Sequence, residues 1–113
     1  MELNEYQKKA AETDHFTEVH DLMAPGMLEK VLGLAGEAGE VADDVKKVIR
    51  DEEGQLTDEN REVIAKELGD VLWYIAGISR YLGYSLEEIA EMNIEKLQSR
   101  KERGVISGSG DNR

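Results

Sequence analysis

Apolar residues recur with a helical period along most of the chain. Between Met27 and about Arg50 they stand at positions 28, 31, 32, 35, 38, 41, 42, 45, 48 and 49. This spacing is close to the 3.6-residue repeat of an amphipathic helix. A second stripe of the same kind predicts a helix over about 58–82. The two long helices are separated by a short polar turn, so we expect them to pack antiparallel.

Two shorter helices complete the prediction. Residues 3 to about 17 form an amphipathic segment, which ends before the break at 24–26, Ala-Pro-Gly. The stretch 85–88, Ser-Leu-Glu-Glu, has the pattern of a capping box and predicts a fourth helix to about Arg103. Strand-length alternation does not occur in the sequence. The expected fold class is therefore all-α, a four-helix bundle-like protomer.

Composition limits the classes of function. The chain has 113 residues, enough for one domain with a modest core, and we therefore expect it to assemble as an oligomer. It has no cysteine, which excludes disulfides, thiolate zinc sites and a cysteine nucleophile. The net charge of −11 argues against binding to nucleic acid. No segment has the apolar length of a membrane span or the pattern of a signal peptide, so a cytoplasmic location is the expectation.

Two pairs of acidic residues interrupt the apolar stripes. Glu37 and Glu40 lie in the first long helix, and Glu67 and Asp70 lie in the second. A spacing of three residues places both members of a pair on one helix face. Carboxylates held together in apolar surroundings repel one another unless a cation compensates them. Hard divalent cations that take oxygen ligands, Mg²⁺ in particular, are the usual compensation.

Three glycines at a spacing of three, Gly33, Gly36 and Gly39, accompany the first acidic pair. Each costs about 1 kcal/mol of helix propensity relative to alanine. Close approach of another backbone or of a ligand is one explanation. Tight helix–helix packing, with the carboxylates at the edge of the bundle, is the other.

Four segments resemble those of a known family. They are 33–41, with the sequence GLAGEAGEV, 66–74, with KELGDVLWY, 93–100, with NIEKLQSR, and the opening 4–7, with NEYQ. In this order they resemble the all-α nucleoside triphosphate pyrophosphohydrolases, specifically the MazG-like branch. The resemblance covers nearly the whole chain, with residues 1–103 as the catalytic domain.

The resemblance implies hydrolysis of a nucleoside triphosphate between its α and β phosphates. Family enzymes hold Mg²⁺, with Mn²⁺ as a substitute, through the positions that match Glu37, Glu40, Glu67 and Asp70. Glu37 or Glu40 is expected to act as general base. Many relatives carry a second glutamate where this chain has Gly36. That departure leaves the number of metal ions and the identity of the base open.

The substrate is expected to contact a further set of residues, most of them from the second half of the chain. Tyr74 lies one turn after Asp70 and is placed to stack on a base or ribose, with a core position as the alternative. The Gly/Ser-rich tail 104–113 is either a flexible end or a segment that closes over the triphosphate. The complete set of expected substrate-binding residues is Lys47, Tyr74, Asn93, Lys96, Arg100 and Arg113.

A non-enzymatic acidic helical interaction module is the alternative function. Such a module would show no dependence on metal and would offer an apolar groove to a partner. As an enzyme, the chain is expected to bind a nucleoside triphosphate, deoxy or otherwise non-standard, and to form a homodimer or homotetramer. The sequence does not determine which base or sugar is preferred.

Overall fold

The computed structural model describes residues 1–16 and 23–113, and within them it contains four α-helices and no β-strand. The helices are α1 (Leu3–Ala11), α2 (Pro25–Asp51), α3 (Asp58–Tyr81) and α4 (Leu86–Glu102). The prediction of an all-α chain with four helices is thus confirmed.

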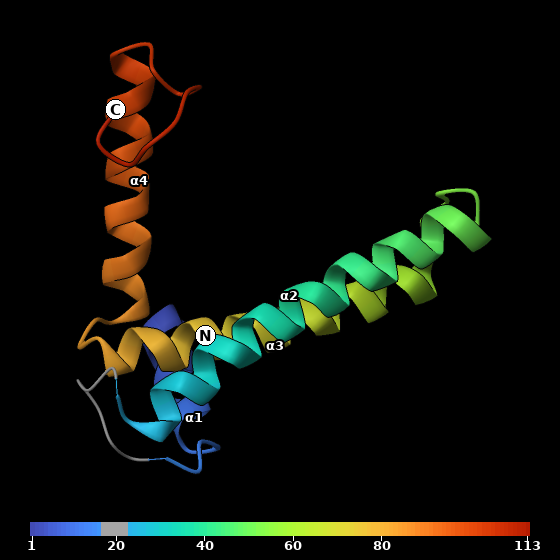
Figure 1. Cartoon of the computed structure of the whole chain (residues 1–113), viewed down its shortest axis with the longest axis horizontal. Coiled ribbons are helices and arrows are strands. Elements are labelled where there is room, and N and C mark those ends of the chain that lie inside the picture. Colours follow the sequence, from blue (N-terminus) through green and yellow to red (C-terminus); the bar gives the residue numbers. More distant parts are fainter. Residues whose placement is uncertain (17–22) are drawn as a thin grey trace.

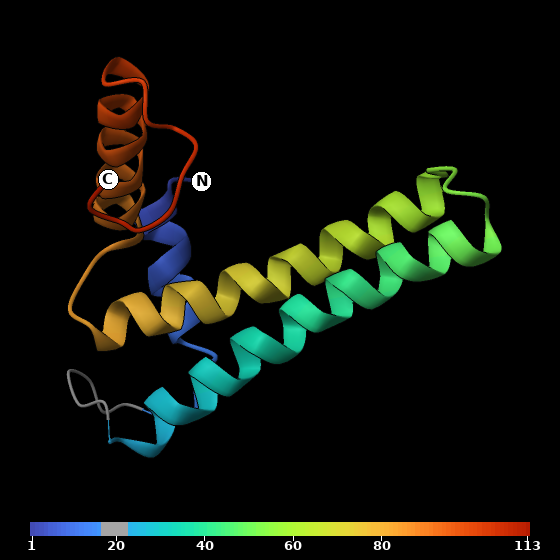
Figure 2. The same cartoon turned by 45° about the horizontal axis from the view of Figure 1, so that its top comes forward.

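α2 and α3 form a long hairpin, and α1 and α4 lie at its open end (Figure 1). α2 and α3 run antiparallel, and α1 packs against α3. α4 projects away from the open end of the hairpin, as Figure 2 also shows, and it contacts α1 and α3 but not α2. The four helices therefore do not all lie side by side, because α4 meets α1 and α3 only near its start.

Local sequence explains where the helices begin and end. Thr57 and Asn60 form a reciprocal capping box at the start of α3. The Ser85 hydroxyl accepts a hydrogen bond from the Glu88 backbone N–H, as the capping pattern predicts. Gly83 follows α3 with a φ of +81°, a conformation that glycine adopts without strain. The bounds of α2, α3 and α4 lie within two residues of the predicted ones.

The first helix is shorter than predicted. It ends at Ala11, so the prediction is wrong for residues 12–16, and residue 17 lies outside the described residues. The Thr13 hydroxyl donates to the Ala10 carbonyl at 2.8 Å, and the Asp14 carboxylate accepts from the Phe16 backbone N–H at 3.0 Å. Such side-chain hydrogen bonds to nearby backbone compete with the helical ladder and turn the chain out of it.

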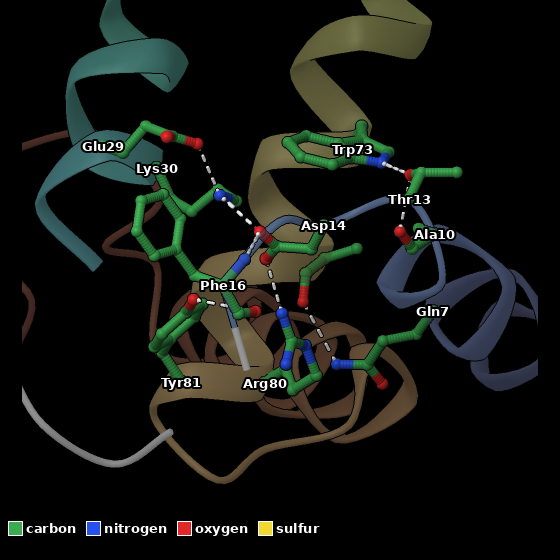
Figure 3. A network of polar contacts seen from close by, with 11 residues as sticks. Gln7, Ala10, Thr13, Asp14, Phe16, Glu29, Lys30, Trp73, Arg80 and Tyr81 are labelled. Atoms are coloured by element: carbon green, nitrogen blue, oxygen red, sulfur yellow. Dashed lines mark hydrogen bonds and ion pairs between the residues drawn. The ribbon is translucent and has the colours of Figure 1, made fainter. Parts of the chain in front are cut away.

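A buried ion cluster ties this turn to the hairpin (Figure 3). The Asp14 carboxylate lies 2.9 Å from the Lys30 ammonium on α2 and 2.6 Å from the Arg80 guanidinium on α3. The side chains of Lys30 and Asp14 are only 0% and 2% exposed. The ammonium also lies over the rings of Phe16 and Trp73, at 5.4 and 5.2 Å. Three separate segments are thereby held in register at the open end of the hairpin.

The same cluster sets the ionisation of Asp14. Burial alone would raise its pKa, but hydrogen bonds from Lys30 and from the Phe16 backbone, with the charges of Lys30 and Arg80, outweigh burial and hold the pKa below its ordinary value of 3.8. A carboxyl whose pKa is lowered by folding stabilises the folded state above its unfolded value. That stabilisation is lost as the pH falls below about 4.

α1 also fixes the start of α4. The Gln7 side chain accepts from the Leu86 N–H at 3.1 Å and donates to the Tyr84 carbonyl at 3.0 Å. One turn earlier, Asn4 accepts from the Glu87 N–H at 3.1 Å. These bonds satisfy free N–H groups in the first turn of α4. The opening segment 4–7 therefore has a structural role in directing α4.

Much apolar surface stays exposed. The radius of gyration is 16.8 Å, whereas a compact domain of this length would have one of about 13 Å. The exposed large apolar side chains include Leu28, Val31, Leu32, Val45, Ile49, Val63 and Leu68 on the hairpin, with Met92, Ile94 and Leu97 on α4. No helix in the described part of the chain is both long and apolar enough to cross a membrane.

Candidate metal centre

Three carboxylates meet across the middle of the hairpin. Glu37 on α2 and Glu67 and Asp70 on α3 each offer one oxygen, and these oxygens all lie within 4.8 Å of one another. Glu37 and Glu67 are half-buried and Asp70 is exposed. Because α2 and α3 are antiparallel, acidic residues on either side of the turn come to the same height, as their positions in the sequence predict.

The centre resists the ionisation of Glu67. Burial, followed by the charges of Asp44, Glu37 and Asp70 and a hydrogen bond shared with Glu37, raises the pKa of Glu67 above its ordinary value. The folded protein therefore favours a proton or another positive charge at this point. The donor set is all carboxylate oxygen, which suits a hard divalent cation such as Mg²⁺.

Glu40, the other predicted ligand on α2, lies one turn beyond Glu37 and is exposed. It does not belong to the three-carboxylate group. The charge of Glu40 acts instead on Lys47. The pKa of Lys47 is raised chiefly by a hydrogen bond with Asp43, and to a smaller degree by the charges of Asp44 and Glu40. A role for Glu40 as ligand or base stays a prediction.

Asp44 lies outside the three-carboxylate group but acts on it, and the sequence analysis did not single it out. It is half-buried, and its charge is the largest charge contribution to the raised pKa of Glu67. The sequence spacing could have identified Asp44, because it stands seven residues after Glu37 and a step of seven returns to the same helix face. The i,i+3 spacing predicts Glu40 instead.

Lys47 lies beside a groove that runs from Asp44 toward the tip of the hairpin. Asp44, Lys47, Asp51 and Asn60 are among the residues that line it. The Lys47 ammonium is 2.7 Å from the Asp43 carboxylate, which also binds Lys46 at 2.6 Å. These two hydrogen bonds lower the pKa of Asp43 to about 2. The structure thus places Lys47 in an exposed ion pair with Asp43, and its role in binding substrate stays a prediction.

Tyr74 lies on the other side of the carboxylates, one turn after Asp70. Its ring packs against the backbone of Gly33, where an added Cβ would lie 2.1 Å from the ring. The ring also meets Trp73 edge-to-face, with centroids 4.9 Å apart. Close approach therefore explains Gly33. At Gly36 and Gly39 an added Cβ would meet nothing within 4 Å in the protomer.

This difference between the glycines predicts opposite effects of alanine. Gly33→Ala should destabilise the protein by about 1–3 kcal/mol, because the Cβ overpacks against the Tyr74 ring. Gly36→Ala should stabilise it by about 0.5–1 kcal/mol, because helix propensity improves at no steric cost. Urea unfolding of the two variants measures both. Destabilisation by Gly36→Ala would mean that another surface covers this position.

The remaining predicted substrate residues lie together on α4 and its tail. Asn93 is exposed, and the Lys96 ammonium lies one turn later, 3.2 Å from the Asp111 carboxylate. Arg100 is buried, and Arg113 donates to backbone carbonyls of the tail. α4 meets α3 only near its start and makes no contact with α2, and the rest of α4 projects away from the hairpin that carries the three carboxylates (Figure 2). Their roles in binding substrate stay predictions.

Comparison with known proteins finds a family match over most of the chain. Residues 27–105, more than half of the chain, match the MazG nucleotide pyrophosphohydrolase domain. In an alignment of 114 positions, which covers the whole of both chains, the protein is 46% identical to the "Gene 37 protein" of Mycobacterium phage L5. That name states no activity. No solved structure matches the chain.

Proposed function

Because the chain belongs to the MazG nucleotide pyrophosphohydrolase domain family, we propose that it hydrolyses a nucleoside triphosphate at the α–β bond in a Mg²⁺-dependent reaction. The products are a nucleoside monophosphate and pyrophosphate. The observation that carries the proposal is the convergence of Glu37, Glu67 and Asp70 from two antiparallel helices onto one point. The substrate is a free deoxy- or otherwise non-standard nucleotide rather than nucleic acid, in keeping with the net charge of −11.

The carboxylates divide the chemistry between them. Glu37, Glu67 and Asp70 would hold the divalent ion, which when bound would offset charge on phosphate oxygens and acidify a water molecule. Glu40 lies one turn away, exposed and outside the three-carboxylate group. It is free to accept the proton of the attacking water, and we assign it the role of general base. Asp44 adds negative charge that acts on Glu67, so a cation bound there would relieve more repulsion.

Substrate contacts come from both sides of the carboxylates. Lys47 would meet phosphate oxygens and Tyr74 would stack on the base or ribose. Asn93, Lys96 and Arg100 would complete the site from a second copy of the chain, because they lie on the part of α4 that projects away from the hairpin in one protomer (Figure 2).

A second copy also accounts for the exposed apolar surface. Isolated apolar residues on a surface are ordinary, but here they follow both long helices and the free length of α4. We therefore propose a homodimer, or a tetramer built from two of them. Light scattering during size-exclusion chromatography should give a mass of at least twice the chain's 12.7 kDa.

Release of pyrophosphate tests the activity. Purified protein should release it from at least one member of a panel of ordinary and damaged nucleoside triphosphates, and only when Mg²⁺ or Mn²⁺ is present. Thermal melting separates the alternative, an acidic interaction module. An enzyme should be stabilised by Mg²⁺ together with a non-hydrolysable nucleotide, whereas a module should be indifferent to both. No hydrolysis and no stabilisation would refute the proposal.

A further inference from the structure

The C-terminal loop, residues 104–113, places a carboxylate between two cations of α4. One oxygen of Asp111 lies 3.2 Å from the Lys96 ammonium and 3.3 Å from Nη2 of Arg100. Arg100 is only 5% exposed, so its position is fixed. The Asp111 side chain is 82% exposed. The Arg100 cation is thus fixed in the helix end, whereas the Asp111 carboxylate that it binds lies at the surface.

The C-terminal loop is closed on itself. The Arg113 guanidinium donates to the carbonyls of Val105, Ile106 and Gly110, at 3.2, 2.9 and 2.6 Å. The loop is joined to the helix end by Nη2 of Arg103, which donates to the Arg113 main-chain oxygen at 2.6 Å, and by backbone bonds from Gly104 and Val105. The loop therefore has internal structure of its own, and it meets α4 chiefly through Arg100, Arg103 and Lys96.

Only some of the hydrogen-bond donors of the Arg100 guanidinium have partners in this arrangement. Its Nη2 makes all three bonds to the loop, to the Gly110 carbonyl, the Asp111 carbonyl and the Asp111 carboxylate. Its Nε is buried with no hydrogen-bond partner. An arginine that recognises phosphate normally presents two parallel N–H groups to two oxygens. The single-oxygen contact with Asp111 leaves that capacity unused.

The local charge also favours an anion. From Lys96 to Arg113 there are five lysines and arginines against two acidic residues, hence a net charge of +3 on a chain of −11. Exposed ion pairs such as the one that Asp111 makes contribute little, because water and salt screen them. An anion with more charge and more oxygens than a carboxylate would compete well for the same cations.

We propose that Asp111 is an internal anion that fills a phosphate-binding site formed by Lys96 and Arg100, so that the C-terminal loop competes with the triphosphate. The inference rests on the proposed function, which assigns Lys96 and Arg100 to substrate. In the absence of nucleotide the loop closes the site, and an incoming polyphosphate displaces Asp111 and releases the loop from Lys96 and Arg100. Asp111 thereby sets the nucleotide concentration at which the site fills.

Binding of inorganic tripolyphosphate without divalent cations tests this competition. Calorimetry on the full chain should show that Asp111→Asn binds about 3- to 10-fold more tightly than the unaltered protein, because a site that is mostly closed binds with an apparent affinity reduced by the fraction that is open. Glu102→Gln is the matched control, since it removes the same charge from an exposed position at the same helix end. Glu102 forms no ion pair within the described residues, so its replacement should change the affinity by less than about 2-fold.

Hydrogen exchange reports the displacement itself. Tripolyphosphate should speed the exchange of amides in residues 104–113 of the unaltered protein. Equal tightening by Asp111→Asn and Glu102→Gln, or weaker binding by Asp111→Asn, would overturn the inference. Because no metal is present, the outcome is independent of hydrolysis. A protein that hydrolyses nucleotides but shows no tightening refutes the loop competition alone, whereas tightening without hydrolysis refutes the proposed function.

Discussion

Glu67→Gln is expected to lower kcat/KM for nucleoside triphosphate hydrolysis by at least about 100-fold, because groups that only support metal ligands already contribute about 10- to 100-fold. The amide keeps the shape of the side chain but removes the charge at the point where Glu37 and Asp70 converge. Steady-state release of pyrophosphate measures the loss. Glu62→Gln is the matched control, because Glu62 lies on the same helix in an exposed pair with Lys66, and it should keep nearly full activity.

A second prediction for Glu67→Gln separates loss of metal binding from loss of folding. The raised pKa of Glu67 means that its ionised form is disfavoured in the folded protein. Such a carboxyl destabilises the folded state above its unfolded pKa, and this destabilisation grows as the pH rises toward the folded value. Without metal, Glu67→Gln should therefore melt no lower than the unaltered protein at neutral pH. It should also lose the stabilisation that Mg²⁺ provides. A lower melting temperature without metal would instead give Glu67 a structural role.

Mixing two inactive variants tests whether the site is shared. Glu67→Gln removes the metal side and Lys96→Ala removes the phosphate side. If one copy supplies the carboxylates and another supplies α4, subunit exchange should restore part of the activity. Failure to restore activity, with mixed oligomers demonstrated, would place both halves of the site within one chain.

Asp14→Ala is expected to have the largest effect on stability. The variant leaves Lys30, which is 0% exposed, with the exposed Glu29 carboxylate at 2.7 Å as its remaining ion-pair partner, and it also frees Arg80. Breaking a buried ion pair in this way costs about 3–5 kcal/mol, which is a large part of the 5–15 kcal/mol that stabilises a typical domain. Urea unfolding measures the change in free energy.

Two comparisons make the Asp14 prediction specific. Asp14→Asn keeps the size of the side chain and an acceptor for the Phe16 N–H, so a similar loss would assign the effect to charge. Asp43→Ala breaks two lysine pairs at the exposed surface of α2 and should change stability little. If Asp14→Ala and Asp43→Ala were alike, the buried cluster would not hold the open end of the hairpin together.

The amino-acid sequence by itself determined the helices and the kind of chemistry. Helix bounds follow from local causes, namely the apolar period, the capping box at Thr57, the cap at Ser85 and the glycine at 83, so they were predictable to within two residues for α2, α3 and α4. The acidic pairs were visible for the same reason, since a helix converts spacing directly into a shared face.

Only the tertiary structure decided which side chains meet. The rotation of α2 against α3 brings Glu37 to Glu67 and Asp70 and leaves Glu40 outside the group. It also makes Asp44 the strongest charge acting on Glu67. It also places Lys30 and Arg80, which are distant in the sequence, against Asp14 in the turn that follows α1. Spacing along one helix fixes a direction in space only relative to that helix, whereas the register and rotation between helices depend on the packing of all their side chains at once.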